Sequence, residues 1–109
     1  MVDKILEISL LYDFYGSLLT NKQKDVIELY YGDDLSLGEI SETIDISRQG
    51  VYDLIKRSEK QLYYYEDKLK LVERFMEQKK KIKKAYELLD SLGKSDKIDS
   101  IKELLSEVL

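Results

Sequence analysis

Residues 36–57 carry two short helical patterns separated by about three residues, and this close spacing limits how the chain can fold. Ser36 and Glu39 have the spacing of a capping box, in which the two side chains satisfy each other's backbone donors at a helix start. Apolar residues then recur at helical spacing, at Leu37, Ile40 and Ile44. We therefore expect a helix over residues 36–44.

The second pattern begins after Ser47, a residue type that favours the N-cap position. Asp45 occupies the turn, where Gly is more usual, and Asp adopts the left-handed conformation more readily than most residues. The inner face of the second helix is expected to hold Val51, Leu54, Ile55, Ser58 and Leu62. This layout is that of a helix-turn-helix, whose second helix can lie in the major groove of DNA.

The outer face of this second helix carries side chains suited to DNA. We expect DNA contacts from Arg48, Gln49, Tyr52, Lys56, Arg57 and Lys60. Arg pairs with guanine and Gln with adenine in the major groove, whereas Lys and Arg also hold phosphates. Asp53 would repel phosphate unless it pairs with Arg57, four residues on. A purely structural or protein-binding use of this helix stays open.

A first helix is expected over about residues 3–15, ending at Gly16. Its apolar stripe consists of Ile5, Leu6, Ile8, Leu11, Tyr12 and Tyr15. Tyr12, Phe14 and Tyr15 form a dense aromatic group. These rings either pack in the core or offer a stacking platform for a base or a partner.

Thr20 and Gln23 predict a capped start for the next helix, which Gly32 ends before a polar turn at Asp33 and Asp34. The buried face of that helix is predicted to hold Val26, Ile27, Leu29 and Tyr30. Its first turn contains Asn21, Lys22 and Lys24. Taken by themselves, these three residues form a solvated helix start.

The pattern after residue 60 continues without Gly until Gly93, and we expect a bend or short break over about residues 66–70 because a single helix would be unusually long. Residues 79–84 include five Lys. These lysines form either a solvated helix face or a contact to the phosphates of a nucleic acid. A last amphipathic helix follows Gly93. Because such a helix is marginal alone, it must bury its stripe on the preceding helix or on another chain. We expect a homodimer.

Composition excludes several classes of function. The 109 residues include no Cys, no His and no Pro, which removes ordinary zinc ligands and the commonest general base. We expect no metal, no cofactor and no enzymatic activity. No apolar run is long enough to enter a membrane as a spanning helix, and a cytoplasmic location is expected. The net charge of −4 argues against a general nucleic-acid coat protein but leaves room for a local basic face.

Two resemblances add to this interpretation. Residues 20–57 resemble region 4 of bacterial sigma factors, where a second helix opening with Ser-Arg reads a promoter element. The helix before the motif touches the phosphate backbone in those proteins, so the resemblance implies such contacts from Asn21, Lys22 and Lys24. Most of the chain resembles a narrower family, the small bacterial YlxM-type proteins. The segments that carry this likeness are LLYDFYGSLLTNKQKDVIELYYGDDLSLGEI, SRQGVYDLIKR and the tail from about residue 62. Gly50 and Asp53 depart from the long polar residues that sigma factors place there.

The resemblance implies an all-α fold with a sigma region 4-like head of three to four helices and a long C-terminal helical tail. We expect a helix-turn-helix domain over residues 1–65 and a tail, suited to dimerisation, over residues 66–109. Double-stranded DNA is the expected partner of a regulatory protein of this kind. The YlxM-type family is associated with the signal recognition particle, so binding to that particle's RNA or protein is an alternative. A helical dimer without a nucleic acid partner is another.

Overall fold

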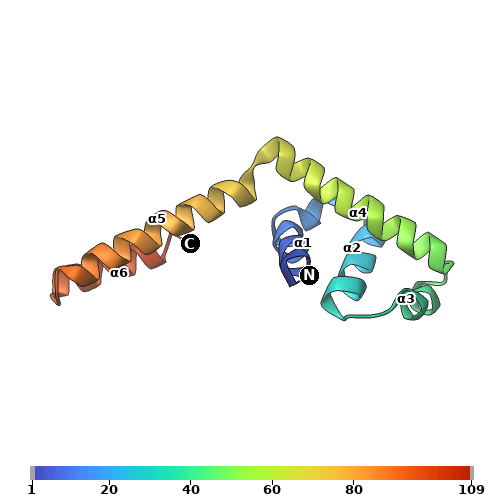
Figure 1. The fold of residues 1–109 in the computed structure, drawn as a ribbon, viewed down its shortest axis with the longest axis horizontal. Coiled ribbons are helices and arrows are strands. Elements are labelled where there is room, and N and C mark those ends of the chain that lie inside the picture. Colours follow the sequence, from blue (N-terminus) through green and yellow to red (C-terminus); the bar gives the residue numbers. More distant parts are fainter. Residues whose placement is uncertain (1, 109) are drawn as a thin grey trace. The chain divides into compact units, whose positions relative to one another are not determined.

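The computed structural model describes residues 2–108, and all regular structure in that range is helical (Figure 1). The elements are α1 (Val2–Tyr15), η1 (Gly16–Leu18), α2 (Asn21–Ile27), η2 (Glu28–Gly32), α3 (Leu37–Ile44), α4 (Arg48–Leu69), α5 (Leu71–Ser91) and α6 (Asp96–Ser106). The prediction of an all-α fold with a helix-turn-helix is confirmed. None of the described helices is both long and apolar enough to cross a membrane.

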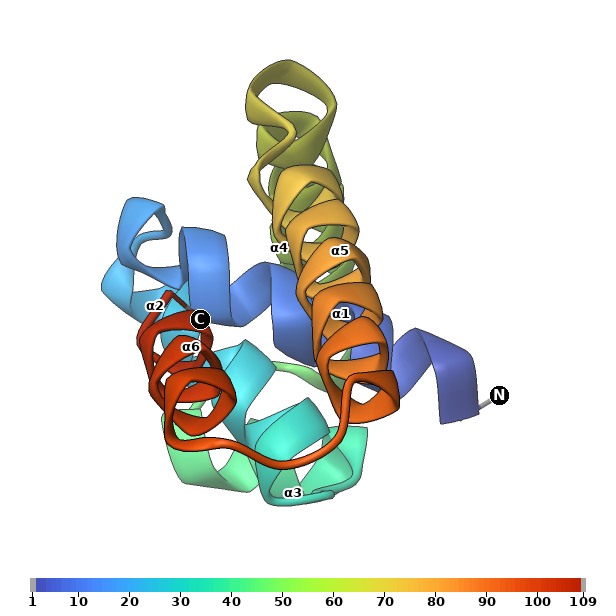
Figure 2. The same cartoon turned by 90° about the vertical axis from the view of Figure 1, so that its left-hand side faces the viewer.

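The chain separates into two compact units, with the boundary between Val72 and Glu73. In the first unit, α1, α2 and α3 each pack against α4, which is the central helix of that unit (Figures 1 and 2). The second unit consists of the remainder of α5 together with α6. The proposed functional division into residues 1–65 and 66–109 stays a prediction.

The helix starts follow from local hydrogen bonds. The Thr20 hydroxyl accepts from the Gln23 backbone N–H at 3.2 Å, and the Gln23 side chain accepts from the Thr20 N–H at 2.9 Å. Ser36 and Glu39 make the same reciprocal pair at the start of α3. Ser47 caps α4 by accepting from the Gly50 N–H at 3.0 Å. All three predicted caps are therefore confirmed.

The turn between α3 and α4 is held by Asp45, which adopts the left-handed conformation with φ of 57°. The Ser41 hydroxyl donates to the Ile46 carbonyl and so ties the end of α3 to the chain that enters α4. The expectation that Asp can replace Gly in this turn is confirmed. This turn fixes how α3 crosses α4.

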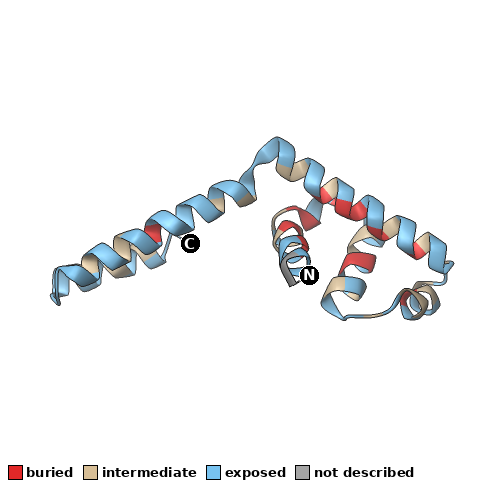
Figure 3. Ribbon diagram, viewed as in Figure 1, coloured by how far each residue is buried: buried red, intermediate tan, exposed pale blue. Residues whose placement is uncertain are grey.

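Two groups of buried side chains hold the first unit together (Figure 3). One group lies where α1, the end of α2 and α4 meet and comprises Ile8, Leu11, Tyr15, Leu19, Ile27 and Leu62. The other joins α2, α3 and α4 through Val26, Ile40, Val51 and Ile55. Tyr12 and Phe14 are partly buried against the first group, so the aromatic residues of α1 pack in the core.

Two parts of the predicted apolar faces are corrected. Ile5 and Leu6 are exposed by 52% and 62%, because α1 turns only one side toward α4. Tyr30 is exposed by 37%, whereas Tyr31 packs against both buried groups. The π-helical turn η2 explains this exchange, because its wider turn shifts the register of the residues that follow Ile27.

The long helical tail breaks at Lys70, within the predicted range 66–70, where φ is 58°. The break is stabilised from α1. The Tyr15 hydroxyl donates to the Glu66 carboxylate at 2.5 Å and accepts from the Leu71 N–H at 3.1 Å. Glu66 also accepts from the Val72 N–H at 3.0 Å. These side chains satisfy backbone donors at the start of α5, which explains a break that no residue type in the sequence requires.

Three fully or partly buried tyrosines predict a loss of stability at high pH. Burial, and then hydrogen bonding to Glu28, raises the pKa of Tyr12 to about 12. Burial, followed by hydrogen bonds to Glu66 and Glu59, also raises the pKa values of Tyr15 and Tyr31. These phenols contribute fully to the free energy of unfolding below their ordinary pKa of 10.0. That contribution is lost as pH rises toward the folded-state pKa values, because the tyrosines of the unfolded chain ionise first.

We therefore expect the urea midpoint of unfolding to be constant from about pH 8 to 9.5 and to fall steadily above about pH 10. Urea titrations monitored by circular dichroism at each pH measure this directly. A midpoint that does not change up to about pH 11.5 would contradict the buried, hydrogen-bonded state of these phenols.

Candidate nucleic-acid interface

The helix α4 is buried along one side and open along the other within the first unit. Its inner side carries Val51, Ile55, Ser58, Glu59 and Leu62, all buried. On the opposite side, exposed side chains recur at intervals of four, three and four residues, at Gln49, Asp53, Lys56 and Lys60. Side chains at such spacing lie along one line on a helix. We call this line the outer row of α4.

An acid lies in the middle of the outer row. Gln49 Nε2 donates to Asp53 Oδ1 at 2.9 Å, so the amide that could read adenine is held by a carboxylate. Asp53 is thus bound by Gln49 rather than by Arg57, the pairing that the sequence left open. A base or phosphate that approaches this point has to displace that hydrogen bond or leave Gln49 out of the contact.

The cationic end of the outer row lies beyond Asp53. Asp53, Lys56, Arg57 and Lys60 line a shallow hollow on the surface of α4. Lys56 Nζ lies 5.5 Å from the centre of the Tyr52 ring and 3.8 Å from Glu59 Oε1. Arg57 and Lys60 are exposed, as is Tyr52. These residues, all predicted from the sequence, are brought to one stretch of a single helix.

Arg48 is placed differently from the prediction. It is exposed, but its guanidinium lies over Gly38 of α3, where a Cβ would come within 3.1 Å of a terminal nitrogen. The absence of a side chain at Gly38 makes room for this arrangement. The group that approaches Gly38 most closely is the guanidinium of Arg48, from the first residue of α4. Arg48 is therefore drawn toward α3 and away from the outer row.

Gly38→Ala should stabilise the protein. Ala is favoured over Gly inside a helix by about 1 kcal/mol, and the three atoms nearest to the added Cβ all belong to the flexible end of an exposed arginine. We expect a rise in melting temperature of roughly 4–8 °C, measured by circular dichroism. Gly50→Ala is the matched control, because its Cβ would lie 3.1 Å from the Ser47 hydroxyl that caps α4. A larger gain for Gly50→Ala than for Gly38→Ala would contradict this account.

The predicted contacts from α2 lie at its first turn. Asn21 and Lys22 are exposed, whereas Lys24 is half-buried. Between them, Gln23 Nε2 donates to Gln61 Oε1 at 2.8 Å and ties this turn to α4 next to Lys60. The start of α2 therefore lies beside the cationic end of the outer row. Lys24 is the least accessible of the three.

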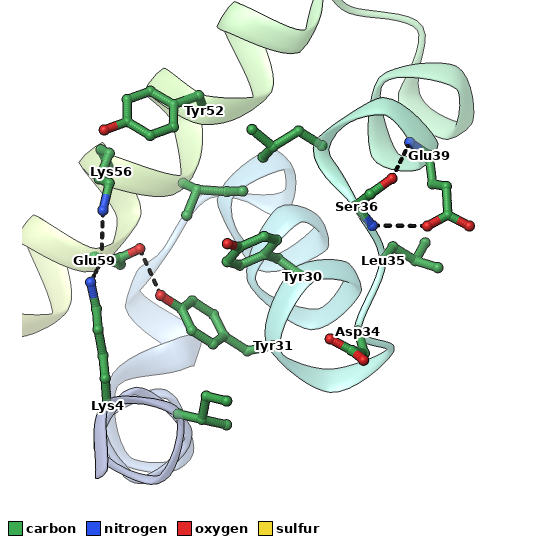
Figure 4. A pocket seen from close by; sticks show the side chains of 13 residues that line it. Lys4, Tyr30, Tyr31, Asp34, Leu35, Ser36, Glu39, Tyr52, Lys56 and Glu59 are labelled. Carbon is green, nitrogen blue, oxygen red and sulfur yellow. Dashed lines mark hydrogen bonds and ion pairs between the residues drawn. The ribbon is translucent and has the colours of Figure 1, made fainter. Parts of the chain in front are cut away.

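A groove that the sequence did not predict lies along the other edge of α4 (Figure 4). It has a volume of about 710 Å³ and runs between α1, η2, the start of α3 and α4. Its walls include Lys4, Ile5, Tyr30, Tyr31, Tyr52 and Lys56. Tyr52 and Lys56 thus face this groove as well as the outer surface of α4.

Glu59 connects the walls of this groove. It is 6% exposed, accepts from the Tyr31 hydroxyl at 2.8 Å and lies 3.1 Å from Lys4 Nζ (Figure 4). Its carboxylate raises the pKa of Lys4 by hydrogen bonding and charge. Glu59 continues the spacing of Val51 and Ile55 on the inner face, and this position could have identified it as a buried acid.

Among residues 2–108, no three acidic, His or Cys side chains are grouped so that they could hold a metal ion. The chemistry available at α4 is that of charge, hydrogen bonding and an exposed aromatic ring. These groups can contact phosphates and base edges in a duplex.

Comparison with known proteins gives a consistent result. The family described as "UPF0122: Putative helix-turn-helix protein, YlxM / p13 like" matches residues 2–104. A UPF0122 protein of Caldanaerobacter subterraneus subsp. tengcongensis is 57% identical over 89 residues, which cover 82% of this chain and 76% of that protein. A UPF0122 protein of Bacillus velezensis is 47% identical over 107 residues, covering 98% and 97% of the two chains. One from a Thermoanaerobacter species is 46% identical over 108 residues, covering 99% and 92%.

Proposed function

The chain belongs to the UPF0122 family of YlxM/p13-like helix-turn-helix proteins, and on this basis we propose that it binds double-stranded DNA through the open side of α4. The observation that carries the proposal is the contrast between the two sides of this helix. One side is buried in the core, and the other presents Lys56, Arg57 and Lys60 at the surface. A regulatory role in transcription is the function that such binding would serve.

The balance of charge predicts weak, salt-sensitive binding. The exposed part of residues 47–60 holds four basic side chains and one acid, Asp53, since Glu59 is buried. Only a few phosphates can be neutralised by such a surface. Affinity should therefore fall with added salt, with a slope that reflects those few contacts. Asn21 and Lys22, beside the end of the outer row, could add contacts to the backbone.

Arg57→Ala tests the proposal. Fluorescence anisotropy with a pool of random duplexes, titrated between about 50 and 200 mM salt, gives the affinity and its salt slope. We expect the variant to bind more weakly, with a slope smaller by about one. Lys94→Ala removes the same charge from the connection between α5 and α6 and should change little. The proposal fails if the wild-type chain does not bind at low salt, or if Arg57→Ala leaves both quantities unchanged.

A second proposal follows from the family resemblance, namely that the protein assists the signal recognition particle. The side chains available for this are the exposed lysines of α5, at positions 79, 80, 81, 83 and 84. Co-purification of the particle's RNA or protein with the tagged chain would support it, and recovery of neither would count against it. In both roles we propose a non-catalytic protein that works in the cytoplasm.

A further inference from the structure

The second unit buries very little of its own apolar surface. Among residues 73–108, Ile82 is the one buried side chain, at 9% exposure. The chain reverses at Gly93, where φ is 92°, so that α6 runs back along α5. Two polar contacts join the helices: the Tyr86 hydroxyl donates to the Lys102 carbonyl at 2.7 Å, and Lys102 pairs with Asp90. Units of about 40 residues rarely sustain a core alone.

Both helices of this hairpin carry a further row of apolar residues beside their mutual contact. The row on α6 consists of Ile101 and Leu104, with Val108 just beyond the end of the helix, and these side chains are exposed by 44%, 64% and 55%. The half-buried residues of α6 are Ile98, Lys102 and Leu105, roughly a quarter of a turn around the helix from this row. On α5, a similar row consists of Ala85 and Leu88 with Leu92 just beyond, and the two leucines are exposed by 58% and 72%.

The rows follow helical spacing, with the second and third members three and seven residues after the first. An amphipathic helix normally has one apolar stripe, so a second stripe on each helix predicts a second packing partner. Because the same two rows occur on every copy of the chain, a copy can bury its rows against those of another copy in a two-fold arrangement.

Charge along the second unit favours one orientation of such a pair. Residues 73–84 contain six basic and two acidic residues, a net charge of +4. Residues 85–108 contain three basic and six acidic residues, a net charge of −3. A parallel pair would place like charges side by side. An antiparallel pair would place the basic part of α5 in one copy beside the acidic segment around Gly93, where the chain reverses, in the other copy.

We propose that the occupant of these rows is a second copy of the chain, and that two α5–α6 hairpins pack antiparallel as a four-helix bundle. In this dimer the lysines of residues 79–84 lie near the acidic end of the partner. The dimer should therefore weaken as salt screens this attraction. The inference does not depend on DNA binding, although a two-fold dimer would present two copies of α4 to a palindromic site.

Sedimentation equilibrium of the full chain without DNA tests the dimer. We expect the wild-type chain to be dimeric at about 100 μM and the Leu88→Glu, Leu104→Glu double variant to be monomeric, because two charges per copy would be buried in the bundle. Leu18→Glu, at a 51% exposed leucine of the first unit, is the matched control and should remain dimeric. Circular dichroism checks that each variant keeps its helices. A monomeric wild-type chain, or a dimeric double variant, would overturn the proposal.

The absence of Cys allows the orientation to be tested with single engineered thiols. Lys81 lies one turn before Ala85 on the line of the α5 row, and Leu92 lies just beyond the helix, so the two positions are about 16 Å apart along it. In an antiparallel dimer, mixing the Lys81→Cys and Leu92→Cys variants under mild oxidation should link position 81 of one copy to position 92 of the other. Each variant alone should link poorly. Peptide mass spectrometry identifies the linked positions, and efficient self-linking at both positions would overturn the antiparallel arrangement.

Discussion

Replacing Lys56, Arg57 and Lys60 together by Glu is expected to lower the affinity for duplex DNA by about 100-fold or more at 100 mM salt. At that concentration, each phosphate contact with a salt slope of about 0.9 is worth roughly eight-fold in affinity. The substitution removes three such contacts and adds three repulsive charges. All three side chains are at the surface of the hollow on α4, so the fold should persist.

A charge-matched control separates local contact from net charge. Lys80→Glu, Lys83→Glu and Lys84→Glu change the net charge by the same amount on exposed positions of α5. We expect the affinity of this variant for the duplex to fall by no more than about ten-fold in the same anisotropy titration, including the part lost through a weaker dimer. If the α5 variant loses more affinity than the α4 variant, the lysines of the tail are the binding surface and the assignment to α4 is wrong.

Ile40→Ala is expected to destabilise the first unit by about 2–5 kcal/mol. Ile40 is fully buried where α2, α3 and α4 meet, against Val26, Val51 and Ile55. Truncation leaves a cavity at the crossing of α3 and α4. Because the whole stability of a small domain is about 5–15 kcal/mol, the melting temperature should fall by tens of degrees.

Ile5→Ala provides the comparison, since it removes the same atoms from a side chain that is 52% exposed. This substitution should lower the free energy of unfolding by less than about 1 kcal/mol. Urea titrations of both variants give the two free energies of unfolding. Equal costs for the two substitutions would mean that Ile40 is not packed at the crossing. DNA binding by folded Ile40→Ala protein should also weaken, because the α3–α4 crossing sets how α4 is presented.

The elements that could be predicted from the sequence are those fixed by neighbouring residues. The capping pairs at Thr20 and Ser36 and the N-cap at Ser47 involve residues three positions apart, so their spacing is visible in the chain. The left-handed turn at Asp45 is likewise a local property. The buried side of α4 followed from helical periodicity, because a helix that packs on one side repeats its apolar residues.

The features that could not be predicted depend on residues far apart in the sequence. The break at Lys70 was expected from length alone, but its support comes from Tyr15, 55 positions earlier in the chain. The π-helical turn that exchanges Tyr30 for Tyr31 has no clear signature in the residues. At the candidate site, the placement of Arg48 over Gly38 and the binding of Gln49 by Asp53 are choices among side-chain conformations. Sequence patterns define which residues share a face but not which of them bind one another.

The measurement that tests the central claim most directly is a titration of isotopically labelled protein with a short duplex, followed by solution NMR. We predict that the largest amide and side-chain shifts map to Gln49, Asp53, Lys56, Arg57 and Lys60, with smaller shifts at the first turn of α2. Shifts confined to residues 79–84, or no shifts at low salt, would contradict the assignment of α4 as the DNA-binding helix.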